Sequence, residues 1–128
     1  MAKRLYGIRG ATGAENTKAS IQEQVTALCK QLFAANGIVS EDLVSIQFTM
    51  TKDLDALNPC FALRHGDVGI DVSACALFAT PELEIAGGAA GLIRVLVTTY
   101  LEEKSVLQHV YISGAEKLRP DFAQANKK

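Results

Sequence analysis

The sequence has few of the residues on which most catalytic and metal sites depend. It contains three cysteines and two histidines among 128 residues, and Cys29, Cys60 and Cys75 are widely spaced. A disulfide framework uses an even number of cysteines, and a zinc site uses closely spaced pairs. The sequence therefore predicts neither, and the cysteines are expected to pack as small apolar side chains in the core.

Neither charge nor hydrophobicity is concentrated in one part of the chain. The 13 basic and 14 acidic residues leave a formal net charge of -1, which provides no basic surface for nucleic acid or for an anionic membrane. No stretch approaches the roughly 18 consecutive apolar residues of a membrane span, and the first residues lack the apolar segment of a secretion signal. We therefore expect a soluble cytoplasmic protein that binds neither nucleic acid nor membranes.

Length and composition fit one folded domain. A chain of 128 residues that is 48% hydrophobic can bury a sizeable core. No internal repeat, low-complexity tract or linker divides it. The expected organisation is a single domain over residues 1–128, with a mobile C-terminal tail from about residue 121.

Helical and strand patterns alternate along the chain. Apolar residues at Ile21, Val25, Leu28 and Leu32 recur with the spacing of one helical face, which predicts a long helix over about 17–35. Strict alternation of apolar and polar residues predicts a strand over 44–51 with one buried face. Less regular patterns predict strands over 4–8, 68–75, 92–100 and 108–113, an interrupted helical turn over 53–65, and a loop over 76–91 that reaches over a site.

Arg94 lies in the most apolar and β-branched run of the chain, residues 92–97. A guanidinium does not lose its proton, and removing it from water costs several kcal/mol unless an anion meets it. Arg94 therefore needs an anionic partner. Arg9, Arg64 and Arg119 also lie in short apolar or tightly turning contexts. One such arginine alone is more often a surface or ion-paired residue, but four together favour a binding site.

The arginines favour the binding of a small organic anion with more than one carboxylate, because a guanidinium matches a carboxylate in bidentate geometry. The sequence offers little else for catalysis. His65 and His109 have no partner at a recognisable nucleophile–base spacing, and no phosphate-binding glycine loop or metal-ligand spacing is present. Taken alone, Glu82 is typical of an exposed loop charge and Tyr111 of a half-buried strand residue. We expect no metal and no cofactor.

Six short motifs, in order along nearly the whole chain, carry a family resemblance. They are Gly7-Ile8-Arg9-Gly10-Ala11-Thr12, Asp53-Leu54-x-Ala56 with Pro59-x-x-Ala62-x-Arg64, Glu82 ahead of Gly87-Gly88, Ile93-Arg94-Val95, His109-Val110-Tyr111 and Leu118-Arg119-Pro120-Asp121. Each is weak by itself, but together they resemble the AroH-type chorismate mutases. The resemblance implies an α/β (α+β) fold, a mixed β-sheet with one long helix packed on it. It also implies a homotrimer whose sheets pack into a pseudo α/β-barrel, with active sites between neighbouring subunits.

The resemblance implies an isomerase that converts chorismate to prephenate in aromatic amino-acid biosynthesis. This intramolecular Claisen rearrangement needs no nucleophile, proton transfer, metal or cofactor, and chorismate carries two carboxylates, so the implied reaction agrees with the residues described above. A protein can promote it by holding the substrate in a compact pose. It can also place a cation where negative charge gathers on the breaking ether bond.

The resemblance further implies roles for individual residues. Arg94 matches the cation at the ether oxygen and the adjacent pyruvyl carboxylate. Glu82 matches the acceptor of the ring hydroxyl, with Glu84 as the alternative because the loop before Arg94 has extra residues. Arg9 and Tyr111 match the pair that grips a substrate carboxylate. The other implied substrate-binding residues attract the second carboxylate or line the walls of the site: Arg64, Arg119, Leu118, Phe78, Ala79, Asn58 and Phe61.

The mouth of the implied site differs from the family pattern at two positions, and the C-terminal tail is expected to lie near it. Asn58 and Phe61 stand where the best-known members have an aromatic residue and a lysine, which predicts weaker binding because one cation is missing. Arg119 lies close to the C-terminal tail, so that tail is expected to close over the substrate as a lid.

Two other functions stay open on the sequence alone. A trimeric enamine or imine deaminase has a similar outline and uses an interface arginine for a substrate carboxylate, but it needs a placed water and one main guanidinium. A non-enzymatic carboxylate-binding trimer, weakened at Phe61, would keep the arginines without turnover. Loss of chorismate absorbance, ammonia release from an imino acid, and saturable binding without turnover distinguish the three.

Overall fold

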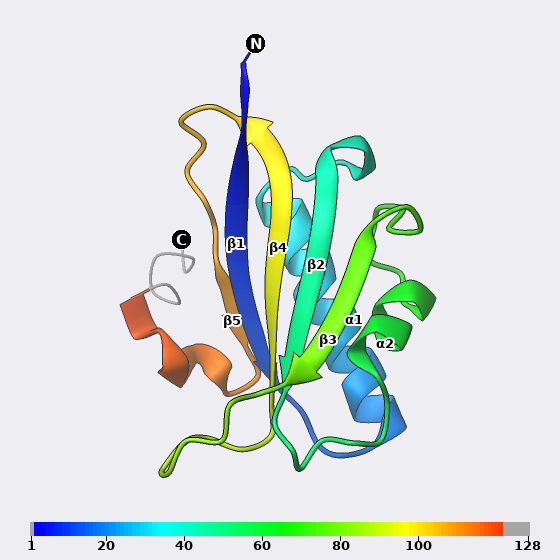
Figure 1. Ribbon diagram of the computed structural model, residues 1–128, viewed down its shortest axis with the longest axis vertical. Coiled ribbons are helices and arrows are strands. Elements are labelled where there is room, and N and C mark those ends of the chain that lie inside the picture. Colours follow the sequence, from blue (N-terminus) through cyan, green and yellow to red (C-terminus); the bar gives the residue numbers. More distant parts are fainter. Residues whose placement is uncertain (1, 122–128) are drawn as a thin grey trace.

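A computed structural model describes residues 2–121, which form a mixed sheet with two helices on one of its faces (Figure 1). The sheet has five strands in the order β3-β2-β4-β1-β5. The strands are β1 (Lys3–Gly13), β2 (Leu43–Met50), β3 (Ala76–Pro81), β4 (Leu92–Glu102) and β5 (Val110–Ile112), and the helices are α1 (Lys18–Ala35) and α2 (Pro59–His65). Short 3-10 helices, η1 (Ser40–Asp42) and η2 (Ala115–Leu118), precede β2 and follow β5. The predicted α+β class is confirmed.

The core lies between the sheet and the helices. In β4, Ile93, Val95 and Val97 are buried, whereas Arg94 and Leu96 between them are exposed. Full burial of a Val or Ile side chain contributes about 1.5–3 kcal/mol. The helix-facing positions of the strands therefore supply stability, and the alternate positions face the open side of the sheet.

Helix α1 confirms the predicted long helix. The apolar face expected from the periodicity is fully buried: Ile21, Val25, Leu28 and Leu32. Thr17 caps the helix, because its hydroxyl accepts a hydrogen bond from the Ser20 N–H at 3.0 Å. No helix in the described part of the chain combines the length and apolar character needed to cross a membrane.

The three cysteines are free, as expected. Cys29 and Cys60 are buried in the hydrophobic core, and Cys75 packs against it. Burial raises the pKa of the Cys29 thiol to about 12, so this side chain stays protonated and unreactive.

The predicted strand over 68–75 is wrong, and β3 lies within the segment predicted to be a loop. Residues 68–75 form bends and turns. Asp67 and Asp71 accept main-chain N–H groups two residues ahead, from Gly69 and Ser73, which is a local alternative to strand pairing. β3 pairs in parallel with β2, from Ser45 opposite Ala76 to Met50 opposite Pro81. It is an edge strand with little buried surface, which is why its pattern is weak.

Other boundaries also differ from the predictions. β1 is longer than predicted and β5 is shorter. The predicted turn over 53–65 becomes helical only at Pro59, where the Asn58 side chain accepts the Cys60 N–H at 2.8 Å. Proline suits the first turn of a helix because its missing N–H would be unpaired there.

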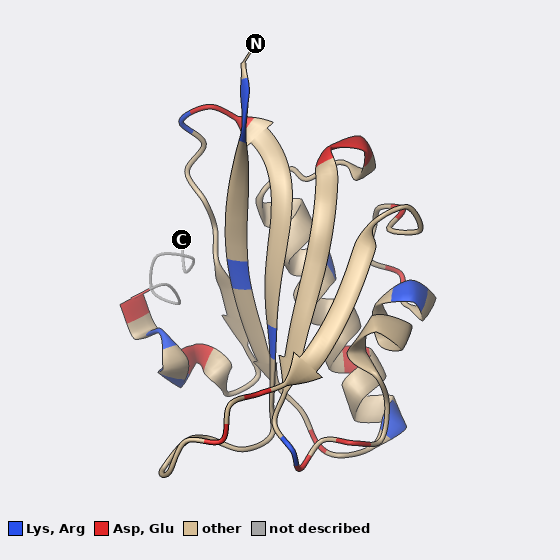
Figure 2. Ribbon diagram, in the orientation of Figure 1, with Lys and Arg blue, Asp and Glu red and all other residues tan. Residues whose placement is uncertain are grey.

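The side of the sheet opposite the helices carries exposed apolar side chains. They occupy positions that pair across the strands on this open face: Leu5 opposite Tyr100, and Leu96 and Phe78 on either side of Gln47. Figure 2 shows charged residues mainly on helices, loops and strand ends, with basic positions inside β1 and β4 as exceptions. The open face therefore combines apolar surface with a few charges.

Asn36 ties the end of α1 to the segment before β5. Its amide nitrogen donates to the carbonyl oxygens of Leu32 at 2.8 Å and Gln108 at 2.9 Å. Its amide oxygen accepts the Gln108 N–H at 2.8 Å.

We expect Asn36→Ala to lower the free energy of unfolding by about 1–3 kcal/mol, because it leaves partly buried main-chain groups of Gln108 without these partners. Lys30→Ala removes an exposed side chain from the same helix and should stay within about 0.5 kcal/mol of the parent. Urea unfolding at one protein concentration measures both. Equal unfolding midpoints for the two variants would contradict the expectation.

Candidate active site

The strand register places polar and apolar residues in two neighbouring rows on the open face. Residues directly opposite each other in adjacent strands point to the same side of a sheet. The first row runs through Thr80, Thr49, Arg94, Ala11 and Tyr111. The second row runs through Phe78, Gln47, Leu96 and Arg9. Residues that are distant in sequence thus meet at one end of the sheet.

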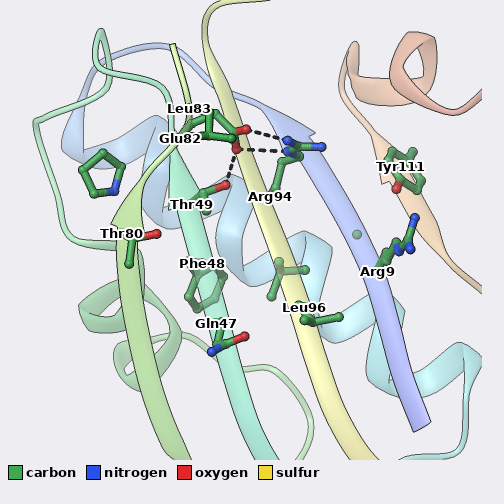
Figure 3. A pocket seen from close by; sticks show the side chains of 13 residues that line it. Arg9, Gln47, Phe48, Thr49, Thr80, Glu82, Leu83, Arg94, Leu96 and Tyr111 are labelled. Atoms are coloured by element: carbon green, nitrogen blue, oxygen red, sulfur yellow. Dashed lines mark hydrogen bonds and ion pairs between the residues drawn. The ribbon is translucent and has the colours of Figure 1, made fainter. Parts of the chain in front are cut away.

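All residues of these two rows except Ala11 and Phe78 line a hollow of about 530 Å³ (Figure 3). Its volume lies in the range of sites for small organic molecules. The polar and charged side chains that line it come from all five strands and from the residue after β3: Arg9, Gln47, Thr49, Thr80, Glu82, Arg94 and Tyr111. Apolar walls come from Leu83 and Leu96, among others.

Arg94 and Glu82 form a bidentate ion pair inside this hollow. The Arg94 Nε donates to Glu82 Oε1 at 3.0 Å, and Nη2 donates to Oε2 at 2.5 Å. The Thr49 hydroxyl also donates to Oε1. The Glu82 N–H donates to the Met50 carbonyl oxygen at 2.9 Å, and this bond holds the main chain of Glu82 beside β2 just after β3 ends. Hydrogen bonding by Arg94 lowers the pKa of Glu82, and the same contact raises that of Arg94.

The environment of Arg94 corrects one expectation from the sequence. Its side chain is 51% exposed in the single chain, so it is not removed from water there. The alternation of β4 buries Ile93 and Val95 against the helices and sends Arg94 to the open face. The anion that meets it is Glu82, whose side chain is 17% exposed. Glu84, the alternative, pairs with Lys52 at 2.9 Å instead.

Arg9 and Tyr111 lie on the other side of the hollow from Glu82, and the Arg9 side chain extends toward Tyr111 (Figure 3). Burial raises the pKa of the Tyr111 hydroxyl, which keeps it protonated and able to donate a hydrogen bond at neutral pH. The Arg9 N–H donates to His109 Nδ1 at 3.0 Å. Burial, with the charges of Arg9 and Arg119, lowers the pKa of His109. A neutral His109 therefore holds the main chain at Arg9.

The segment after β5 lies beside Tyr111. Leu118 packs on the apolar cluster of Ala11, Tyr111 and Ala115. The Arg119 guanidinium forms a bidentate pair with Asp121, at 3.2 and 2.9 Å, and its charge acts on Tyr111. Arg119 does not line the hollow itself. The expected tail from about residue 121 lies outside the described residues except for Asp121 itself, so the lid stays a prediction.

The other residues implied by the resemblance do not line this hollow within one chain. Arg64 is exposed on α2 and borders a separate hollow with Asp71. Phe61 stacks on His65, with ring centroids 3.9 Å apart, and Asn58 caps α2. The four arginines therefore converge only in part, because α2 packs on the helical side, against α1 and β3.

Phe78 and Ala79 point to opposite sides of β3. Phe78 is 59% exposed and lies on the open face opposite Gln47. Ala79 is opposite Phe48 and packs against the core. Neither lines the hollow around Arg94 in the single chain.

Three residues that line the hollow, Gln47, Thr49 and Thr80, are not among those predicted from the sequence. The sequence pattern does indicate the first two, because the alternation over 44–51 places them on the face of the strand away from the buried Ile46 and Phe48. Thr80 had no usable signal, since its strand was predicted to be a loop.

The arrangement can bind a small organic dianion that also carries a hydroxyl group. Arg9, Arg94 and Tyr111 supply hydrogen-bond donors, two of them cationic, and guanidinium groups suit carboxylates. Glu82 is held as an anion and can accept a hydroxyl proton in a hydrogen bond. Within residues 2–121, no group of three or more His, Cys, Asp and Glu side chains could hold a metal ion.

Comparisons with known proteins point to one family. A family model described as chorismate mutase type I matches residues 5–122. The chain is 34% identical to chorismate mutase AroH of Thermus thermophilus over 122 residues, which cover 93% of this chain and 97% of that protein. It is 30% identical to chorismate mutase AroH of Bacillus subtilis, with 93% of each chain covered. A solved chorismate mutase from Clostridium thermocellum superposes with a TM-score of 0.79 at 34% identity, over 88% of this chain and 98% of that one.

The neutral state of His109 makes stability depend on pH. Its pKa in the folded chain lies below the ordinary value of 6.5, so the unfolded chain takes up a proton at higher pH than the folded chain. The free energy of unfolding should therefore fall as the pH drops from about 7 toward 5. His109→Asn, whose side-chain oxygen can still accept the Arg9 N–H, should weaken this dependence.

Chemical unfolding at a series of pH values measures the effect. His65→Asn is the matched control, because it makes the same substitution at the other histidine and keeps His109. An unchanged slope in His109→Asn would show that His109 is not responsible.

Proposed function

Because the chain belongs to the type I chorismate mutase family, we propose that the hollow around Arg94 is its active site for the conversion of chorismate to prephenate. The observation that carries the proposal is the Arg94 guanidinium, aligned by Glu82 in a hollow that also contains Arg9 and Tyr111. The family's enzymes are isomerases of aromatic amino-acid biosynthesis. A spectrophotometric assay for loss of chorismate, with prephenate identified as the product, tests the activity.

Arg94 is proposed to stabilise the transition state. In the rearrangement the ether C–O bond breaks while a new C–C bond forms, and negative charge gathers on the ether oxygen. The bond to Glu82 uses Nε and one hydrogen of Nη2, which leaves donors on both Nη atoms for the ether oxygen and the adjacent carboxylate. A donor already held in place loses little orientational freedom when the reaction occurs.

The neighbouring groups are proposed to hold the substrate in its compact pose. Glu82 accepts a hydrogen bond from the ring hydroxyl, and its lowered pKa keeps it ionised for that role. Arg9 and Tyr111 grip a carboxylate from the other side of the hollow. Fixing both ends of a flexible substrate removes conformational freedom before the barrier is reached.

We propose a homotrimer in which a neighbouring chain completes each site. Two observations support this assembly. The hollow is open on the side away from the helices, and exposed apolar residues such as Leu5 and Tyr100 cover the same face of the sheet. Arg64 and the other implied residues outside the hollow, Asn58, Phe61, Phe78 and Ala79, would then belong to the wall that the neighbouring chain supplies. Arg119 and Leu118 lie beside Tyr111 and would border the second carboxylate. A cytoplasmic location stays a prediction.

Arg94→Ala should lower kcat by about 10²- to 10³-fold, equivalent to roughly 3–4 kcal/mol of barrier, because it removes a positioned donor to the ether oxygen. Arg94→Lys should recover only part of the activity, since an ammonium cannot bind two oxygens in the same fork. Initial rates of chorismate consumption measure both.

The matched control is Arg4→Ala, which removes an arginine that lies over the Tyr6 ring outside the hollow. It should keep the parent kcat. Size-exclusion chromatography with light scattering checks that all variants keep the parent assembly. A parent kcat in assembled Arg94→Ala would remove Arg94 from the mechanism.

Mixed assemblies test whether Arg64 comes from a neighbouring chain. Arg94→Ala and Arg64→Ala are each expected to have low activity alone. If each site uses Arg94 of one chain and Arg64 of the next, random trimers refolded from an equal mixture should contain both arginines in about a quarter of their sites. Activity should rise accordingly on mixing. Mixtures without any gain would contradict the shared site.

A further inference from the structure

Thr49 lies on β2, between β3 and β4, next to the ion pair of Arg94 and Glu82. It lies opposite Arg94 of β4 and opposite Thr80 of β3, on the open face. Its hydroxyl donates to Glu82 Oε1, the oxygen that also accepts Arg94 Nε at 3.0 Å. Figure 3 shows Thr49 and Arg94 reaching Glu82 from different strands. The carboxylate is therefore held by side chains of β2 and β4 as well as by its own main chain.

The hydrogen bonds already made by the Glu82 carboxylate determine which of its oxygens can accept another one. Each carboxylate oxygen accepts about two hydrogen bonds, and Oε1 already accepts from Thr49 and from Arg94. Oε2 accepts from Arg94 Nη2 at 2.5 Å. The acceptor site that is left for another donor thus lies on Oε2.

We propose that Thr49 is a positioning residue that turns Glu82 so that Oε2 receives the ring hydroxyl of the substrate. This role rests on the proposed function of the hollow. Thr49 acts through Glu82 and makes no contact with the reacting atoms. Valine has the same shape and suits a strand equally well, so packing alone does not require the hydroxyl at this position.

The charged groups around Glu82 determine how its pKa responds when the Thr49 hydroxyl is removed. Among the described residues, the charged group paired with Glu82 is Arg94 of β4. Across the hollow, β1 and β5 contribute Arg9 and Tyr111, and the nearby Lys52 is paired with Glu84. Without Thr49, the pair with Arg94 persists, but Oε1 regains an acceptor site and the pKa of Glu82 rises, because Thr49 is one of the donors that lower it.

The test compares Thr49→Val, which removes only the hydroxyl, with Thr49→Ser, which keeps it. Thr49→Val should lower kcat/KM by about tenfold or more, the effect of a lost hydrogen bond to a charged group. The acid limb of its kcat/KM profile should move to higher pH, because this limb reports ionisation in the free enzyme. Thr49→Ser should restore both. Thr98→Val removes a hydroxyl from the same face outside the hollow and should match the parent.

Each outcome decides the proposal. A parent-like kcat/KM in Thr49→Val, or a loss of activity without a shift of the acid limb, would overturn the role of Thr49. The proposed function would then stand if Glu82→Gln and Arg94→Ala are still impaired. Parent activity in those two variants would instead overturn the proposed function and this inference together. If Thr49→Val does not fold or assemble, Thr49→Ala against Thr49→Ser provides the same comparison.

Discussion

The bidentate pair between Arg94 and Glu82 is the interaction on which the arrangement of the hollow depends. It joins the beginning of β4 to the residue directly after β3, two strands that are not neighbours in the sheet. Half of the Arg94 side chain is exposed, and an ion pair in contact with water adds little to stability. The ion pair instead orients Arg94, because two parallel hydrogen bonds fix the plane of the guanidinium before any ligand binds.

The same strands serve stability and binding through the two-residue period of their side chains. In β4, Ile93 and Val95 point into the core, while Arg94 and Leu96, which alternate with them, line the hollow. A rigid, well-packed inner face therefore holds the outer face in register. This explains how groups separated by up to a hundred residues, such as Arg9 and His109, keep a hydrogen bond of 3.0 Å.

Protonation states around the hollow agree with the chemistry of an anionic substrate. Hydrogen bonding keeps Glu82 ionised, and burial keeps Tyr111 protonated and His109 neutral. The result is a surface that presents two cations, of which Arg94 is held by an ion pair, together with one hydroxyl donor and one carboxylate acceptor. These are the groups expected for a ligand with two carboxylates and a hydroxyl, and no proton has to move for that ligand to bind.

The sequence by itself determined the features that depend on local periodicity and on residue chemistry. These include the buried face of α1, the two faces of β2, and the motifs that resemble the AroH-type chorismate mutases. Pairing between distant strands was decided only by the tertiary structure. The parallel placement of β3 beside β2 brings Glu82 to Thr49 and Arg94, whereas the packing of α2 keeps Arg64 away from them in a single chain. A local pattern specifies which way a side chain faces along its own strand, but neighbours across a sheet depend on strand order and register, which no short segment encodes.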